Sequence, residues 1–210
     1  MKFNKEQIQT LQDIILTRRD VRGHSFLDKK IPQDDLDKIL EAGVHAPSVG
    51  YSQPWKFVII DDEKIKQDMR DNFDIENAKA KKIFEHKKIY KELKLEGITE
   101  APLNIAVFYE HPNEPTIGMT SIEKMGEYSV VCAVQNMWLM ARALDIGLGW
   151  ISILDEKKVL KTLNAPDNHQ LIAYLALGYV DKFYAEPELK TVKWKDEKTM
   201  QECVIKNKWA

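Results

Sequence analysis

The sequence is poor in cysteine, and its two thiols, Cys132 and Cys203, lie far apart. They supply neither a disulfide framework nor the close spacing of a zinc site. Five scattered histidines form no H-E-x-x-H motif, so we expect no bound metal. No apolar run approaches the roughly 20 residues that a membrane helix needs. The N-terminal residues also lack the apolar stretch of a secretory signal. We therefore expect a cytoplasmic protein without a membrane segment.

A marked excess of charge of either sign is also missing. The chain has 31 Lys and Arg against 33 Asp and Glu, for a net charge of −2, which argues against nucleic acid as a partner. No G-x-x-x-x-G-K-[ST] phosphate loop is present, and the G-x-G of residues 147–149 leaves a helix and enters a strand. The dinucleotide fingerprint needs the reverse order. At 210 residues, we expect one domain over residues 1–210.

The order of the expected elements predicts an α+β fold. Periodicity predicts helices at residues 5–17, 32–46, 64–95, 128–144 and 157–163, and strands at 55–60, 103–109, 148–153 and 172–180. We expect a central mixed sheet of four or five strands covered by helices. The helix at 128–144 is apolar on more than one face, as expected for a buried or interface helix. Together with the irregular tail from Phe183, it predicts a homodimer with an extended C-terminal arm.

The run Arg18-Arg19-Asp20-Val21-Arg22 carries three guanidinium groups and one carboxylate. Arginine offers planar, permanently charged donors that hold phosphate in a bidentate manner. The run therefore suits a ligand that has a phosphate at one end. Asp20 has two interpretations: a salt-bridge partner of its neighbours, or a carboxylate that they keep ionised and that faces a bound ligand.

Two further stretches carry polar groups beside expected strands. The loop from Ala46 to Trp55 has two prolines, a glycine, Ser48 and Gln53, so it is a constrained loop suited to ligand contacts, or an ordinary connection. Ser152 is the only hydroxyl in the strand at 148–153, and is either a buried structural group or one that projects into a pocket. The polar segment 110–125 suits a mobile loop or lid.

Several of these stretches, taken in order, look familiar. They are Arg18–Arg22, Ala46-Pro47-Ser48 with Gln53-Pro54-Trp55, Leu95-Glu96-Gly97-Ile98, Tyr128-Ser129, and Gly149-Trp150-Ile151-Ser152. The set resembles the FMN-dependent nitroreductase superfamily and, more narrowly, its 5,6-dimethylbenzimidazole synthase (BluB) branch. Each motif is short, but the ordered set covers the chain from about residue 14 to 195.

The resemblance implies a homodimer with FMN at the subunit interface. It further implies that reduced FMN reacts with O2 and is consumed, giving 5,6-dimethylbenzimidazole, the lower ligand of vitamin B12, and erythrose 4-phosphate. A separate flavin reductase would supply the reduced FMN. Asp20 and Ser152 would be catalytic. The implied flavin contacts are Arg18, Arg19, Asp20, Val21, Arg22, Ser48, Gln53, Leu95, Gly149 and Ser152.

Two other functions fit the same motifs. One is an NAD(P)H-dependent FMN nitroreductase, or a quinone or flavin reductase, and the other is a non-catalytic flavin-binding protein. Asp20 and Ser152 together favour the synthase over both. Two positions depart from the family pattern: Met119 stands where an arginine is expected, and Ser52 where a methionine is common. These departures bear on the reaction more than on the fold.

Overall fold

The computed structural model describes residues 1–209, in which four strands form one sheet of order β1-β2-β4-β3. The strands are β1 (Trp55–Ile60), β2 (Leu103–Glu110), β3 (Ile146–Ile151) and β4 (His169–Tyr179). Each ladder between neighbouring strands is antiparallel, so the expectation of a mixed sheet was wrong. The segment that contains Asp20 runs parallel to β3 and forms a single bridge, from Asp20 to Leu148. This pairing is too short to count as a fifth strand.

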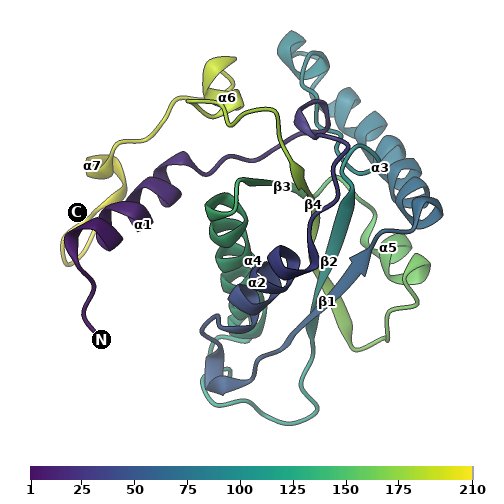
Figure 1. Cartoon of the computed structure of the whole chain (residues 1–210). Coiled ribbons are helices and arrows are strands. Elements are labelled where there is room, and N and C mark those ends of the chain that lie inside the picture. The colour runs from purple at the N-terminus through teal and green to yellow at the C-terminus, as the bar shows by residue number, and fades with distance from the viewer. Residues whose placement is uncertain (210) are drawn as a thin grey trace.

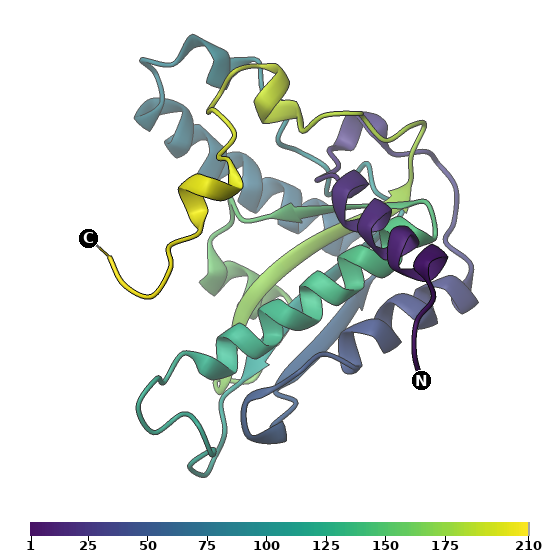
Figure 2. The same cartoon turned by 90° about the vertical axis from the view of Figure 1, so that its left-hand side faces the viewer.

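Helices cover both faces of the sheet, giving three layers (Figures 1 and 2). The α-helices are α1 (Lys5–Thr17), α2 (Gln33–Val44), α3 (Glu63–Ile83), α4 (Met125–Ala143), α5 (Glu156–Thr162), α6 (Glu188–Thr191) and α7 (Met200–Cys203). Short 3-10 turns are η1 (Gly23–Ser25), η2 (Val49–Tyr51) and η3 (Lys88–Lys91). Residues of α2 and α4 share one core cluster with the sheet, and residues of α3 and α5 share the other.

The central strand β2 explains why two layers of helices form. Its side chains alternate between faces, so Ile105 and Val107 join the core under α2 and α4, whereas Ala106 and Phe108 join the core under α3 and α5. All four are buried. A strand that is apolar on both faces must be covered on both sides, which the unbroken hydrophobic run of its sequence predicts.

The long charged helix expected at residues 64–95 is shorter than predicted. α3 ends at Ile83, and Phe84 then stacks on Tyr90 with ring centroids 4.8 Å apart. Both rings also contact Trp194 of the C-terminal tail. Burial of this aromatic cluster outweighs continued helix in a solvated, lysine-rich stretch, so residues 84–95 fold back as a turn, η3 and coil.

The strand expected at 148–153 begins and ends two residues earlier. Asp145 adopts a left-handed backbone with φ of 55°, which turns the chain directly from α4 into β3 at Ile146. Ser152 therefore follows the strand instead of lying in it, and is exposed in the single chain. Cys132 is exposed on α4.

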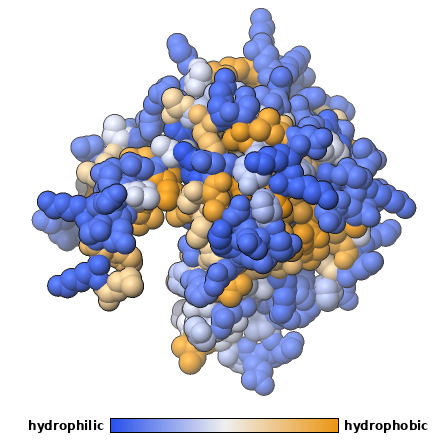
Figure 3. Space-filling view, in the orientation of Figure 1, coloured by the Kyte–Doolittle hydropathy of each residue, from blue (hydrophilic) through white to orange (hydrophobic). Residues whose placement is uncertain are grey.

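Within residues 1–209, no helix is long and apolar enough to cross a membrane, and no cluster of three or more His, Cys, Asp or Glu side chains could hold a metal. The extent of the single domain stays a prediction, and Ala210 lies outside the described residues. The end formed by α1 and α7 stands off from the body of the molecule, with an open notch beneath it (Figure 3).

Candidate functional site

The arginine-rich run lies against β3. Val21 donates its backbone N–H to the carbonyl oxygen of Leu148 at 3.1 Å, and Asp20 forms the single parallel bridge to the same residue. Gly149 permits this approach, because a Cβ atom at that position would lie 2.2 Å from the carbonyl oxygen of Val21. The glycine of the Gly149-Trp150 motif is thus required by close backbone packing.

Asp20 is held from two sides. Its Oδ1 accepts a hydrogen bond from the backbone N–H of Trp150 at 3.0 Å, and its Oδ2 pairs with the guanidinium of Arg22. Arg22 also donates to the carbonyl oxygen of Trp150 at 3.4 Å. The carboxylate is therefore fixed in orientation beside the end of β3. Its interpretation as a salt-bridge partner is confirmed by the Arg22 pair, whereas its interpretation as a group that faces a bound ligand stays a prediction.

Opposing effects act on the pKa of Asp20. Burial raises it above its ordinary value, while Arg22, the Trp150 N–H and Arg18 lower it, and burial prevails. The side chain still keeps 35% of its surface exposed, so it lies in a recess open at one side. The arginines act in the direction expected from the sequence, but the surrounding protein makes Asp20 a better proton acceptor than a surface aspartate.

The other two arginines of the run have different surroundings. The Arg18 guanidinium lies 4.6 Å from the centroid of the Trp138 ring. Arg19 is engaged with backbone carbonyls: its Nε donates to Tyr184 at 2.9 Å, its Nη1 to Leu16 at 2.8 Å, and its Nη2 to Ala185. Its predicted role as a flavin ligand stays a prediction, whereas its contact with the C-terminal tail is a feature that sequence reasoning missed.

Most of the predicted site residues lie around two adjoining pockets. The larger is lined by Arg19–Arg22, Leu95 and the tail residues Phe183, Tyr184 and Glu186–Leu189, among others. A smaller pocket is lined by Arg22, Leu95, Trp150 and Ser152, with Phe73, Ile151 and Ile153. Arg22 and Leu95 belong to both. The fold thus brings Asp20 and Ser152 to one region, on either side of Arg22.

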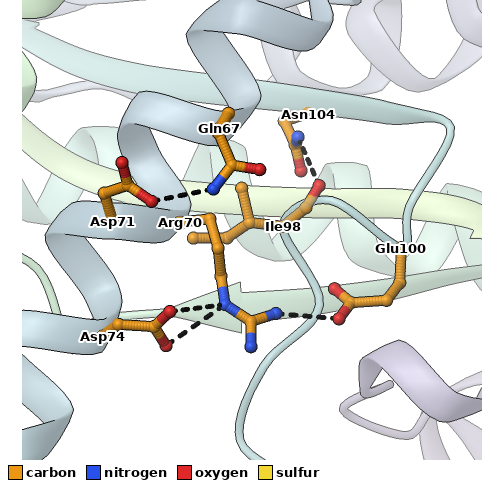
Figure 4. A network of polar contacts seen from close by, with 7 residues as sticks. All are labelled: Gln67, Arg70, Asp71, Asp74, Ile98, Glu100 and Asn104. Carbon is orange, nitrogen blue, oxygen red and sulfur yellow. Dashed lines mark hydrogen bonds and ion pairs between the residues drawn. The ribbon is translucent and has the colours of Figure 1, made fainter.

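Polar contacts fix residues 95–100, the wall of the pocket that carries Leu95, and Figure 4 shows those made by Ile98 and Glu100. The carbonyl oxygen of Glu96 accepts a hydrogen bond at 2.8 Å from the N–H of Gly23, the residue that follows the arginine run. Asn104 in β2 is buried and donates to the carbonyl oxygen of Ile98 at 2.9 Å. Arg70 of α3 pairs with Glu100 at 2.8 Å. These contacts explain the Leu95-Glu96-Gly97-Ile98 motif as a structural wall.

Ser48 and Gln53 lie at the other end of the sheet. Gln53 donates its N–H to Ser48 Oγ at 3.1 Å, and Pro54 accepts from Glu110 N at the last residue of β2. Leu148, by contrast, pairs with Leu177 of β4, which in turn pairs with Leu103, the first residue of β2. Leu148 therefore lies at the opposite end of β2 from Glu110. At about 3.3 Å per residue, these levels are roughly 20 Å apart. One chain therefore does not bring the two sets together.

The loop around Gln53 is strained. Gly50, Tyr51 and Gln53 all have φ near +50°, a conformation that non-glycine residues rarely adopt. Ser129 of α4 secures the loop by accepting a hydrogen bond from the Val49 N–H at 3.0 Å. This role was missed, although Tyr128-Ser129 belonged to the resemblance. The segment expected as a lid, residues 110–125, packs against Val49 and Gly50 and lies at this end of the sheet, away from Asp20.

The profile of the nitroreductase family matches residues 15–179. The chain is 37% identical over 185 residues to a 5,6-dimethylbenzimidazole synthase from Rhodospirillum rubrum, covering 86% of this chain and 87% of the relative. It is 32% identical over 202 residues to a protein of the same name from Rhodobacter capsulatus, covering 93% and 96%.

Solved structures share the fold. A BluB-like flavoprotein from Clostridium difficile has a TM-score of 0.70 at 21% identity, covering 94% of this chain and 99% of that one. An iodotyrosine deiodinase bound to FMN and 3-iodo-L-tyrosine has a TM-score of 0.72 at 24% identity, covering 95% and 100%. The chain belongs to the nitroreductase family. Within that family it falls in the BluB branch, whose curated relatives are 5,6-dimethylbenzimidazole synthases.

Proposed function

We propose that this protein is a 5,6-dimethylbenzimidazole synthase, which uses O2 to fragment reduced FMN to 5,6-dimethylbenzimidazole and erythrose 4-phosphate. The observation that carries the proposal is the fixed carboxylate of Asp20, held between Arg22 and the Trp150 N–H at the rim of a pocket. A reductase that returns its flavin unchanged needs no such base beside it. The names of the relatives in the same branch support the same reaction.

The residues present fit FMN. Arg22 lines both pockets, and Arg18 lies near enough to lower the pKa of Asp20, so two guanidinium groups are available to the phosphate and the polar edge of the ring. Leu93, Leu95 and Phe183 line the same pocket with apolar surface, which suits the flat ring system. Reduced FMN would supply the electrons and the carbon skeleton of the product. The remaining contribution of the protein is to bind, orient and move protons.

A homodimer would complete this site. Within one chain, Ser48 and Gln53 are about 20 Å from Asp20, so they would reach the flavin from the partner subunit. The apolar residues Ile8, Leu11, Ile15 and Leu16 of α1 are exposed in the single chain. On α4, Tyr128, Val131 and Cys132 are exposed as well. Such surface is expected to be covered by a second copy, which the notch in Figure 3 could admit.

Asp20 and Ser152 have separate roles in the proposal. Breaking the ribityl carbon–carbon bond requires a proton to leave a hydroxyl or a carbon, and Asp20 would accept it as general base. The Trp150 hydrogen bond and the Arg22 pair keep the carboxylate in one orientation for this transfer. Ser152, across Arg22, would donate a hydrogen bond that orients the reacting edge of the ligand.

A second candidate is an NAD(P)H-dependent nitroreductase, or a quinone or flavin reductase, because the family as a whole is consistent with it. A third is a flavin carrier without chemistry. One experiment separates the three. Purified protein is mixed with excess reduced FMN, exposed to air, and its products are separated by chromatography. Formation of dimethylbenzimidazole supports the synthase. A separate flavin reductase in the cytoplasm would then supply its reduced FMN. NAD(P)H oxidation with a quinone and no such product supports the reductase, and neither activity supports the carrier.

A further inference from the structure

The C-terminal tail after β4 carries features that the proposed function does not use. Residues 183, 184 and 186–189 line the pocket of Asp20, as do Leu93 and Leu95. We call residues 183–194 the pocket arm. This part of the chain includes α6, and Figure 2 shows it beside the end of α3. An arm that only wrapped a second subunit would have no reason to form a wall of a pocket in its own chain.

The pocket arm is fastened at its beginning. Arg19 donates to the carbonyl oxygens of Tyr184 and Ala185, and the Arg142 guanidinium of α4 lies 4.2 Å from the centroid of the Phe183 ring. Arg142 is itself anchored, since it donates to Thr17 at 3.1 Å. Two arginines, Arg19 after the end of α1 and Arg142 in α4, thus hold the first residues of the arm next to Asp20.

The pocket arm is also fastened at its end. Lys193 has a left-handed backbone with φ of 55°, and the Trp194 N–H donates to the carbonyl oxygen of Leu189 at 2.9 Å, so the chain turns back after α6. The Trp194 ring then packs edge-on to Phe84, at 5.7 Å between centroids, and Lys87 Nζ lies 4.1 Å from its centroid. Aromatic and cation–π contacts thus hold the Trp194 ring against residues 84–87.

This turn ties the pocket arm to residues 84–95, the segment that carries Leu93 and Leu95. The two walls of the pocket, arm and segment, therefore meet at Trp194. We propose that Trp194 and Arg19 are positioning residues that hold the pocket arm as a wall against the bound flavin of the same chain, so that the Trp194 contact slows release of FMN. This inference rests on the proposed flavin site, and extends it to a part of the chain beyond the matched family region, 15–179.

The test uses the full-length protein and oxidised FMN, so that no turnover is needed. Variants Trp194→Ala, Trp194→Phe and Trp209→Ala are compared by stopped-flow fluorescence. Trp209 is the matched control, because it lies on the same tail but is 82% exposed. We expect Trp194→Ala to raise the dissociation rate of FMN about tenfold, equivalent to about 1.4 kcal/mol, with the association rate within twofold of wild type. The dissociation rate of Trp194→Phe should lie close to that of wild type, because an aromatic ring remains. The rate of Trp209→Ala should match wild type.

A second readout needs no flavin. Hydrogen exchange of the backbone amides of residues 183–194 should be faster in Trp194→Ala than in wild type, while α4 and β2 exchange as before. Unchanged dissociation and unchanged exchange would overturn the proposal. An equal rise in both FMN rate constants would also overturn it, because the arm would then be a gate and not a wall. If wild type binds no FMN, the proposed function itself fails. If wild type binds FMN but Trp194→Ala leaves its release unchanged, only the role of the pocket arm fails.

Discussion

The backbone N–H of Trp150 and the carboxylate of Asp20, 130 positions apart in the chain, are joined by a 3.0 Å hydrogen bond. This bond links the arginine run to the end of β3 and leaves Asp20 at the rim of a pocket. It depends on Gly149, the residue before Trp150, whose lack of a side chain lets the two backbones touch. The same contact therefore fixes the backbone beside β3 and orients the carboxylate that we propose as the general base.

Replacement of Asp20 by Asn should separate chemistry from binding. The amide keeps the size of the side chain and can still accept from Trp150, but it cannot take up a proton. We expect dimethylbenzimidazole formation to fall by at least about a hundredfold, the usual contribution of a general base. FMN affinity, measured by fluorescence titration, should change by less than about tenfold. If FMN binding is lost instead, Asp20 is a structural residue.

The raised pKa of Asp20 has a consequence for stability. Because the folded pKa lies above the ordinary 3.8, folding disfavours the ionised form, and this penalty grows as pH rises from about 3.8 through the folded value. Wild type should therefore lose stability relative to Asp20→Asn between pH 4 and pH 7. We expect less than about 1 kcal/mol, because solvent screens a side chain that is a third exposed. Urea unfolding of both proteins at the two pH values measures it, and a change of opposite sign contradicts the burial effect.

A methyl group at Gly149 should displace the arginine run. In Gly149→Ala, the new Cβ would meet the Val21 backbone, which cannot rotate away. We expect a loss of about 1–3 kcal/mol in the free energy of unfolding, together with weaker FMN binding. Gly147→Ala is the comparison, because its Cβ would meet only side-chain atoms of Val180 and Val21 and not the backbone of the arginine run. Equal losses in both variants, measured by thermal unfolding, would argue against a special role for Gly149.

The exposed face of α1 should lie in the dimer interface. Leu11→Glu places a charge on that face, and we expect monomers by light scattering, together with loss of FMN affinity as Ser48 and Gln53 leave the site. Ile75→Glu on α3 is the control, since Ile75 is 48% exposed against 53% for Leu11. It should remain dimeric. A Leu11→Glu protein that stays dimeric would place the interface elsewhere.

The layers of the fold could be predicted from the sequence because its long apolar runs are unambiguous. The strand at Trp55–Ile60 matches its prediction, and the buried run of β2 ends one residue later than expected. The end of α3 could not be predicted, because it depends on Phe84 meeting Trp194 from the far end of the chain. Local periodicity carries no information about such a contact.

The candidate site was predictable in composition but not in arrangement. The arginine run with Asp20, and Ser152, stood out in the sequence itself. The resemblance added their catalytic roles and the flavin contacts, which stay predictions. Two features were out of reach: the Trp150 N–H, which has no side-chain signature, and the engagement of Arg19 by the carbonyls of Tyr184 and Ala185. Both depend on backbone atoms brought together by the tertiary fold, and any residue type could supply them.

The most direct test of the account is a mass balance in a single turnover. Wild-type protein is loaded anaerobically with less than one equivalent of reduced FMN, exposed to air, and quenched. We predict that FMN disappears and that dimethylbenzimidazole and erythrose 4-phosphate appear in equal amounts, while Asp20→Asn returns its flavin intact. Recovery of all the flavin as oxidised FMN from wild type, with hydrogen peroxide as the only other product, would contradict it.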